Sequence, residues 1–413
     1  MTDTSKPRSL YICYFGVREP LVRTQVIPYL REIVKDGVEM HLLTFEPENL
    51  SSEDVESETR ALAEQGITWH RRRYHKWPSV PATFYDILVG IIAVRSLTKR
   101  FGFDILHARV HLPALMASIA RRLMRQKPKI LFDIRGFFPE EYTDAGIWPE
   151  NGWLYRAAKR VERWLLKEAD GFVVLTEKAR DILFPGSRET GSDEQGRPVE
   201  VIPCCVDLKR FETANAASRA DIRAELDIGE RYTAAYVGAF GGWYLTDETA
   251  ELFAAMREVH PDVFLLILTQ SDHAMILPRL ESHGFSSSDM AIMKVPSDDI
   301  PRYLSAADVA VSFIKPSYSK QASSPTKNAE YLAAGIPVIA NTNVGDVDGL
   351  ILENGVGVLV DSFDREAYLK VLYDVDRLGN VSEQCRKIAR ERFDLGSVGG
   401  SRYRRLYRKL LQR

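Results

Sequence analysis

Short apolar runs alternate with helix-like segments along the whole chain, in two successive series. Apolar runs of this length indicate strands that are buried on both faces of a parallel sheet. Alternating strands and helices build doubly wound α/β domains, so the two series predict two Rossmann-like domains. The expected strands are residues 10–15, 40–45, 104–107, 129–134, 171–175 and 199–202, followed by 232–237, 263–268, 292–295, 309–313, 337–340 and 357–360.

The chain has 413 residues, which is too long for one ordinary core and fits two domains. We expect the first domain over residues 1–205 and the second over 206–395. The basic helix within residues 396–413 packs either back onto the first domain or onto the second. Ligands of doubly wound sheets bind beyond the carboxyl ends of the strands, so we expect a site in a cleft between the two domains.

The segment 323–340 predicts a loop, a short helix, a glycine stop and a buried strand. Ser324 suits the N-cap, Pro325 the first helical position and Gly335 the left-handed stop. Lys327 is unusual, because a cation in the first turn opposes the helix dipole by roughly 0.3–1 kcal/mol. An anion bound at that terminus would explain it.

Glu330 follows Lys327 by three residues and shares its helix face. A cation for phosphate beside a carboxylate for hydroxyls suits a phosphorylated sugar. The alternative is a solvated ion pair, worth about 0.2–0.5 kcal/mol.

The net charge is −2, but the charged residues are unevenly distributed along the chain. Residues 60–130 carry 14 Lys and Arg but only Glu64, Asp86 and Asp104 as acidic residues. Such a span favours an anionic partner, a membrane surface or a phosphorylated acceptor, unless its charges are scattered over solvated helix faces. No nucleic-acid recognition motif accompanies it.

Four cysteines without metal-ligand spacing indicate a reduced, cytosolic protein and no metal site. Residues 1–9 are polar, so no signal peptide is expected. The longest apolar run, residues 87–94, is too short to span a bilayer.

Three segments together resemble the family 4 retaining glycosyltransferases of the GT-B fold. They are residues 169–177 (ADGFVVLTE), 201–211 (VIPCCVDLKRF) and 325–339 (PTKNAEYLAAGIPVI). The resemblance covers nearly the whole chain and implies sugar transfer from a nucleotide sugar, UDP- or GDP-linked, with retention at the anomeric carbon. It also implies that the first domain binds the acceptor, that the second binds the donor, and that no cofactor or metal is needed.

The resemblance assigns donor-binding roles to several residues. Glu330 matches the second glutamate of the family motif and would bind ribose hydroxyls. Ala322 stands where the first glutamate is expected, so backbone amides and hydroxyls of Ser323 and Ser324 are our substitutes for its sugar contact. Gly16 matches the glycine loop that approaches the donor phosphates, or it is an ordinary strand-ending turn.

The family's Arg/Lys pair after the first strand of the second domain is missing. Residues 238–244 (GAFGGWY) stand there, and Gly241 and Gly242 would let the backbone approach the donor. Lys327 is therefore the first candidate for the phosphate cation and catalytic residue, and Lys320 the second. Arg135 takes the place of the family's histidine as a second catalytic candidate, or it forms a salt bridge with Asp133 or a nearby glutamate.

These features predict a cytoplasmic glycosyltransferase of polysaccharide or glycoconjugate synthesis, acting on a glycan, glycolipid or lipid-phosphate-linked acceptor. The basic span would suit docking to the inner leaflet as a peripheral membrane protein. Two alternatives share the fold: a non-catalytic nucleotide-sugar-binding or partner subunit, and a nucleotide-sugar epimerase, against which the motif order argues. A nicotinamide dehydrogenase is disfavoured, because no Gly-x-Gly-x-x-Gly follows a strand.

Overall fold

The computed structural model describes residues 6–412, so residues 1–5 of the polar N-terminal stretch and residue 413 of the last segment lie outside it. The chain divides into two compact units. The first runs up to Pro203 and resumes at Leu395, and the second is Cys204–Asp394. The C-terminal segment therefore belongs to the first unit.

The first unit is built on a seven-stranded sheet in the order β3-β2-β1-β4-β5-β6-β7, with all neighbours parallel. Its strands are β1 (Arg8–Ile12), β2 (Glu39–Glu46), β3 (Ile67–Arg73), β4 (Ile105–Arg109), β5 (Lys129–Asp133), β6 (Gly171–Val174) and β7 (Val199–Val201). Its helices are α1 (Pro20–Gln25), α2 (Ile27–Val34), α3 (Ser52–Glu64), α4 (Ser79–Phe101), α5 (His111–Arg122), α6 (Phe138–Asp144), α7 (Trp153–Glu168), α8 (Glu177–Leu183), α9 (Ser187–Thr190) and α18 (Ser401–Leu411).

The second unit repeats the plan with six parallel strands in the order β10-β9-β8-β11-β12-β13. These are β8 (Thr233–Val237), β9 (Phe264–Leu268), β10 (Met290–Met293), β11 (Val309–Ser312), β12 (Val338–Asn341) and β13 (Gly357–Val360). The helices are α10 (Ala216–Glu225), α11 (Thr246–Val259), α12 (Leu277–Ser282), α13 (Ile300–Leu304), α14 (Thr326–Ala334), α15 (Val347–Leu352), α16 (Arg365–Arg377) and α17 (Ser382–Phe393).

Both sheets have the doubly wound order in which the strand sequence reverses once. The reversal lies between β1 and β4 in the first sheet and between β8 and β11 in the second. In the second unit, successive residues of β8 alternate between two apolar cores, one on each face of the sheet. The predicted pair of Rossmann-like domains is confirmed.

Two local features were not predicted. Strand β3 was not expected, because it is an edge strand that ends in three arginines. Helices α1 and α2 are separated by a break at Val26, because Pro28 occupies the start of α2 and cannot donate a helical hydrogen bond.

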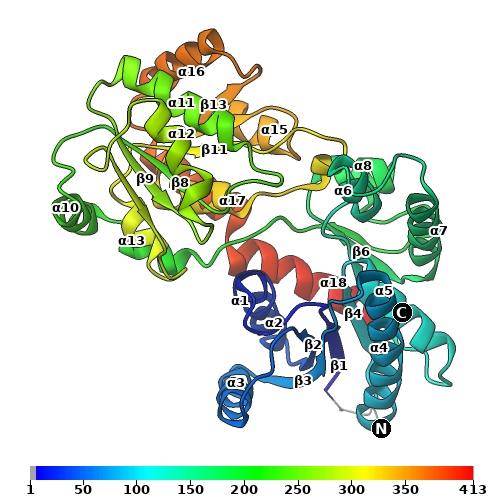
Figure 1. Ribbon diagram of the computed structural model, residues 1–413. Helices are drawn as coiled ribbons and strands as arrows, with labels where there is room; N and C mark the ends of the chain where they lie inside the picture. The colour runs from blue at the N-terminus through cyan, green and yellow to red at the C-terminus, as the bar shows by residue number, and fades with distance from the viewer. Residues whose placement is uncertain (1–5, 413) are drawn as a thin grey trace. The chain divides into compact units, whose positions relative to one another are not determined.

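Helix α18 is held in the first unit by ion pairs and buried tyrosines. It lies beside α2 (Figure 1), where Arg404 contacts Glu32 at 2.9 Å and Arg408 contacts Asp36 at 2.6 Å. Its apolar side is buried in the same unit, with Tyr403 1% exposed. The chain thus completes the first unit only after the second has been made.

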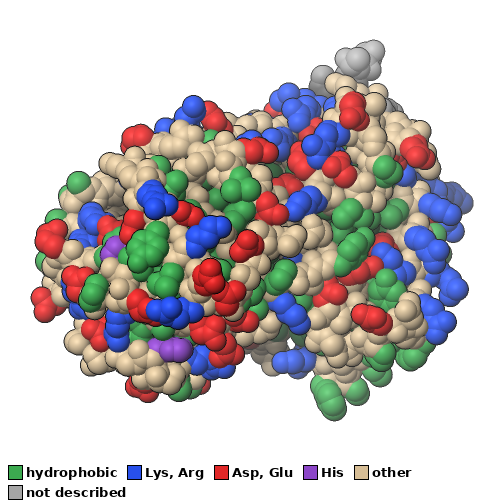
Figure 2. Space-filling view, turned by 90° about the horizontal axis from the view of Figure 1, so that it is seen from above, with side chains coloured by type: hydrophobic (Ala, Val, Ile, Leu, Met, Phe, Trp, Pro, Cys, Tyr) green, Lys and Arg blue, Asp and Glu red, His purple; other side chains and the backbone are tan. Residues whose placement is uncertain are grey.

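The basic span 60–130 is dispersed in the folded unit. Arg109 is buried, Arg121 pairs with Asp170, and Arg122 pairs with Glu168 at 2.6 Å. On the face that Figure 2 displays, Lys and Arg side chains are interspersed with Asp and Glu over much of the surface, and several Lys and Arg side chains lie together at its right edge. The span is therefore not one continuous cationic patch.

The apolar run 87–94 belongs to the longer helix α4, which has 23 residues. By length and hydropathy alone, it is the one helix in the described part of the chain that could cross a membrane. Core helices of soluble proteins have the same properties, and part of α4 is buried in the first unit.

Candidate functional site

Tyr331 bridges strands β8 and β11 at the topological switch point of the second sheet. Strands β8 and β11 pair only as far as Ala235 and Ala310. Beyond that point the Tyr331 hydroxyl accepts a hydrogen bond from the Val237 amide at 2.8 Å and donates one to the Val311 carbonyl at 3.2 Å. This bridge fixes α14 at the carboxyl edge of the sheet, where doubly wound sheets bind ligands.

Lys327 lies one turn before Tyr331 in the first turn of α14. Its ammonium lies 4.1 Å from the centre of the Tyr236 ring and 4.4 Å from that of Tyr244. The side chain is buried, and its Nζ atom has no hydrogen-bond partner. Burial lowers the pKa of Lys327 to about 7, although the nearby Glu330 carboxylate opposes the shift. The alternative of a solvated ion pair is therefore wrong for Lys327.

The glycine-rich loop after β8 makes room for this ammonium. Gly238 has a φ of +125°, and a Cβ atom added there would lie 3.1 Å from the Lys327 Nζ. Gly241 and Gly242 also have positive φ values, +75° and +59°, and the Tyr244 amide donates to the Gly241 carbonyl at 3.0 Å. Glycine is needed for these backbone conformations.

Lys320 is brought to the same loop. It is buried, and its Nζ lies 3.9 Å from the centre of the Trp243 ring. The two adjacent aromatic residues of the loop, Trp243 and Tyr244, thus each cover one of the two lysines that are candidates for the phosphate cation. A buried cation over an aromatic face is stabilised by about 2 kcal/mol or more, less than the hydration that it gives up.

Glu330 is partly buried on the same helix. Desolvation raises the pKa of its carboxyl group to about 7, against the opposing charges of Arg210 and Lys327. Arg210, which was not predicted as a site residue, lies on the 3-10 turn Leu208–Thr213 and donates to the Ser297 carbonyl. The only signal for Arg210 was its place in the 201–211 motif.

The start of α14 differs from the prediction. The helix begins at Thr326 with Pro325 as its cap and without a side-chain capping bond. Ser324 is not the N-cap, because its Oγ accepts a hydrogen bond from the Cys204 amide at 3.1 Å. Ser323 is partly buried just before it. The first amides of the helix therefore have no side-chain acceptor. Gly335 ends the helix with a φ of +83°, as predicted.

Two further polar residues at this end of the unit were missed. Asn328, next to Lys327, is 2% exposed, and neither the nitrogen (Nδ2) nor the oxygen (Oδ1) of its side chain has a hydrogen-bond partner. The buried Ser312 hydroxyl at the carboxyl end of β11 also has none. Unpartnered buried polar groups are rare in folded proteins and indicate places where a ligand or water completes the bonding.

The Arg135 side chain in the first unit belongs to a buried network of charged and polar groups. Its Nε lies 2.8 Å from an Asp133 carboxylate oxygen, and its guanidinium donates to the Tyr403 hydroxyl. That hydroxyl donates to Asp133 at 3.0 Å, and Arg109 lies 3.9 Å from the same carboxylate. The neighbouring arginines and His107 hold the pKa of Asp133 well below its ordinary value, although burial opposes them. The structure thus contains the salt bridge that was the alternative to a catalytic role.

Gly16 follows β1 at the reversal point of the first sheet. A Cβ atom there would come within 2.6 Å of Pro47 and 2.9 Å of the Glu46 carboxylate. Close packing against the end of β2 thus explains the glycine without a ligand. Its predicted contact with donor phosphates stays a prediction.

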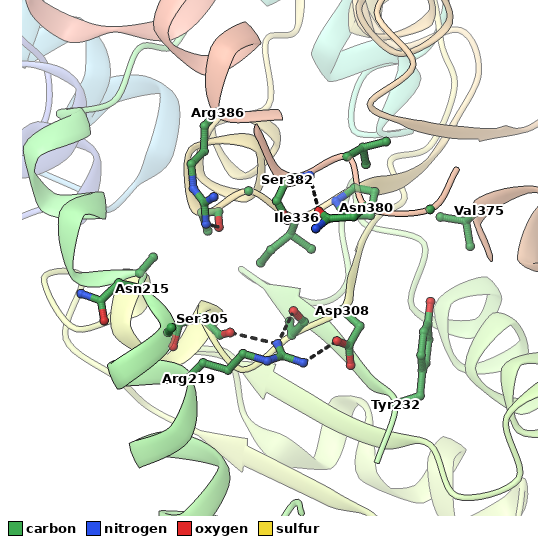
Figure 3. A pocket seen from close by; sticks show the side chains of 18 of the residues that line it. Asn215, Arg219, Tyr232, Ser305, Asp308, Ile336, Val375, Asn380, Ser382 and Arg386 are labelled. Atoms are coloured by element: carbon green, nitrogen blue, oxygen red, sulfur yellow. Dashed lines mark hydrogen bonds and ion pairs between the residues drawn. The ribbon is translucent and has the colours of Figure 1, made fainter. Parts of the chain in front are cut away.

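The second unit also contains a cavity of about 490 Å³ at the opposite edge of its sheet, formed by residues such as Tyr232 that precede the strands. Figure 3 shows Arg219 reaching across its floor to Asp308, at 2.6 Å. Arg386 on the other side donates to the Ala334 carbonyl at 3.2 Å. Both arginines are engaged, so this cavity is a weaker candidate than the Lys327 site. Within residues 6–412, no three His, Cys, Asp or Glu side chains group as they would around a metal ion.

Comparisons with known proteins agree with this geometry. The family models described as Glycosyltransferase Family 4 and Glycosyl transferases group 1 match residues 22–210 and 218–392. A 2-deoxystreptamine glucosyltransferase from Streptomyces kanamyceticus is 29% identical over 185 residues, a match that spans only 44% of this chain and 44% of that relative.

Solved structures resemble the chain over nearly its full length. A sucrose-phosphate synthase from Thermosynechococcus elongatus has a TM-score of 0.72 at 16% identity, covering 98% of this chain and 100% of that one. HepE from Anabaena, in complex with UDP and glucose, has a TM-score of 0.69 at 13% identity, covering 97% and 100%. At such identities the likeness is one of fold, and the fold is GT-B.

Proposed function

Because the chain belongs to the group 1 glycosyltransferases of family 4, we propose that it transfers a sugar from a nucleotide diphosphate sugar to a glycan, glycolipid or lipid-phosphate-linked acceptor. The second unit binds the donor and the first binds the acceptor. The reaction retains the configuration at the anomeric carbon and belongs to polysaccharide or glycoconjugate synthesis at the cytoplasmic face of the membrane.

One observation carries this proposal: a buried lysine without a hydrogen-bond partner stands at the start of a helix, at the switch point of the sheet. The diphosphate of the donor would accept hydrogen bonds from Lys327 and from the first amides of α14. As the bond to the sugar breaks, negative charge grows on the leaving phosphate, and these groups stabilise it. Lys320 lies at the other aromatic residue of the loop and is the second candidate cation.

The remaining donor contacts follow from the same arrangement. Glu330 accepts hydrogen bonds from the ribose hydroxyls, and Gly241 and Gly242 allow the backbone to approach the nucleotide. Ser323 and Ser324 take the place of the missing carboxylate at Ala322. We propose a uridine nucleotide before a guanosine nucleotide, because the structural relative HepE binds UDP and glucose.

A thermal-shift experiment tests the donor site. UDP, GDP, ADP and their sugar conjugates are added to the wild type, Lys327→Ala and the matched control Lys370→Ala, an exposed lysine on α16. We expect one nucleotide to raise the melting temperature of the wild type and of the control but not of Lys327→Ala. Equal shifts in all three proteins would overturn the role of Lys327.

A non-catalytic nucleotide-sugar-binding subunit is the second candidate. It is favoured by Ala322, which is 2% exposed and has no carboxylate to offer the donor sugar. Nucleotide binding without release of nucleoside diphosphate, with or without acceptor glycans, would support this alternative.

A further inference from the structure

Six large apolar side chains are exposed within the sixteen residues 77–92. Trp77 is 86% exposed, Ile92 68% and Phe84 63%, and the others are Val80, Tyr85 and Leu88. The positions 80, 84, 88 and 92 are four residues apart, so they form one stripe along the outer side of α4. In the described part of the chain, no other stretch of this length has as many exposed large apolar side chains.

The opposite side of α4 is packed into the first unit. Asp86 is buried and accepts hydrogen bonds from the Tyr14 hydroxyl at 2.7 Å and the His75 amide at 2.9 Å. Gly90 lies so close to α5 that an added Cβ would be 2.4 Å from the Met116 sulfur. Crossing a bilayer would require these contacts to break and a carboxylate to enter hydrocarbon. Helix α4 is therefore suited to lie on a membrane rather than to span it.

Cations continue and flank the apolar stripe. Arg95 and Lys99 extend its line toward the end of α4, and Lys76 and Arg100 lie just outside it, all four exposed. Asp86 is the one acidic residue between positions 74 and 102, and it is buried. An exposed apolar stripe that is flanked by cations, in a segment without an exposed carboxylate of its own, complements an anionic lipid surface.

The topology places this stripe near the predicted acceptor side. Strand β3 ends at Arg73 and α4 starts at Ser79, so the apolar start of α4 lies at the carboxyl edge of the first sheet. The loops that follow β1 and β4 begin at this same carboxyl edge, because the strands of the sheet are parallel. A lipid-linked acceptor would therefore meet this edge from the bilayer.

We propose that the first unit docks on an anionic lipid bilayer through the outer face of α4. The apolar side chains between Trp77 and Ile92 enter the interface, and Lys76, Arg95, Lys99 and Arg100 contact the headgroups. This proposal rests on the proposed function only for its purpose, delivery of a lipid-linked acceptor.

Vesicle co-sedimentation of the full chain tests the proposal. The vesicles are pure phosphatidylcholine, or phosphatidylcholine with about a third phosphatidylglycerol, at low and high salt. We expect binding to the anionic vesicles at low salt, and at least about tenfold weaker binding at high salt and to the neutral vesicles. Absence of binding to the anionic vesicles at low salt would overturn the proposal.

Two pairs of matched variants separate the surface from the rest of the chain. Phe84→Ser with Ile92→Ser, and Arg95→Gln with Lys99→Gln, should each weaken vesicle binding about tenfold or more. The controls Leu352→Ser with Tyr373→Ser, and Arg365→Gln with Arg377→Gln, replace exposed residues of the second unit and should bind like the wild type.

Two readouts keep the result interpretable. Nucleotide-induced thermal shifts should be the same in all these variants, so a failure of the donor site would be seen separately from a failure of docking. If the α4 variants bound vesicles like the wild type, or if they changed only the oligomeric state, the stripe would be a protein interface and the lipid proposal would be wrong.

Discussion

If a nucleoside diphosphate binds beside Lys327, as proposed, its binding would be coupled to protonation of the Lys327 ammonium. Its pKa is lowered to about 7 by burial, from about 10.4 in an exposed lysine. A diphosphate beside it favours the charged form, so the site must take up a proton when the nucleotide binds above pH 7. We therefore expect the dissociation constant of the nucleoside diphosphate to rise about tenfold per pH unit above pH 7.

Isothermal titration calorimetry between pH 7.5 and about 9 measures this dependence. Repeating the titration in buffers of different ionisation enthalpy gives the number of protons taken up on binding, which should approach one per nucleotide. Lys327→Met should bind weakly and without this pH dependence. Glu330, with its pKa also raised to about 7, is mostly ionised across this window and titrates mainly at its lower end, so the slope is taken from the upper part of the window. A wild-type affinity that is flat above pH 7.5 would show that Lys327 stays charged or is not at the site.

The Tyr331 hydroxyl supports the strands that carry the site. Tyr331→Phe removes the acceptor of the buried Val237 amide, which costs about 1–3 kcal/mol of the free energy of unfolding. Urea unfolding measures the loss, and Tyr373→Phe, an exposed tyrosine on α16, is the control. A loss below about 0.5 kcal/mol would mean that the hydroxyl bridge is replaced by water.

At the scale of elements, the Arg135 network joins the end of β5 to α18. Arg135→Met leaves the Asp133 carboxylate buried with less compensation, and breaking such a pair costs about 3–5 kcal/mol. We expect a large loss of stability and an unchanged nucleotide-induced thermal shift. A variant of wild-type stability that turns over slowly would instead restore Arg135 as a catalytic residue.

The elements that could be predicted from the sequence are those with a strong local signal. Twelve of the strands were expected, because each contains a short, mainly apolar run, and most are buried on both faces, although the edge strand β10 is only partly buried. Strand β3 was missed, because it is an edge strand whose outer residues are arginines. The start of α14 was misplaced by a tertiary contact, since Ser324 bonds the Cys204 amide, 120 residues away, instead of capping the helix.

The same holds for the candidate site: a residue with a local sequence signal could be predicted, and features that depend on tertiary contacts could not. Lys327 was selected from its unfavourable place in the helix dipole, a property of the local sequence. Its cover by Tyr236 and Tyr244 depends on the course of the loop after β8, and the unpartnered state of Asn328 depends on burial. Neither the tyrosine cover of Lys327 nor the unpartnered state of Asn328 is marked by a pattern in the local sequence. The two readings of Arg135 could not be separated, because its pairing with Tyr403 joins residues 268 positions apart.

At the scale of the whole molecule, the second unit is inserted into the first. The chain leaves the first unit at Pro203 and returns at Leu395. The two ends of the inserted unit meet, because the Val206 amide donates to the Phe393 carbonyl at 2.9 Å and Val206 pairs with Asp394. A unit with adjacent ends, its own sheet and its own apolar cores has what independent folding requires.

We therefore expect residues 204–394 to fold alone and to bind the nucleoside diphosphate within about threefold of the full chain, because Lys327, Glu330 and the glycine loop all lie in this unit. Calorimetric titration of both proteins measures the ratio, and a ligand at 100 times its dissociation constant should stabilise the isolated unit by about 2.7 kcal/mol. A folded unit that binds more than about a hundredfold less tightly would show that the donor site needs the first unit. That result would favour the predicted phosphate contact of Gly16 over the packing that otherwise explains this glycine.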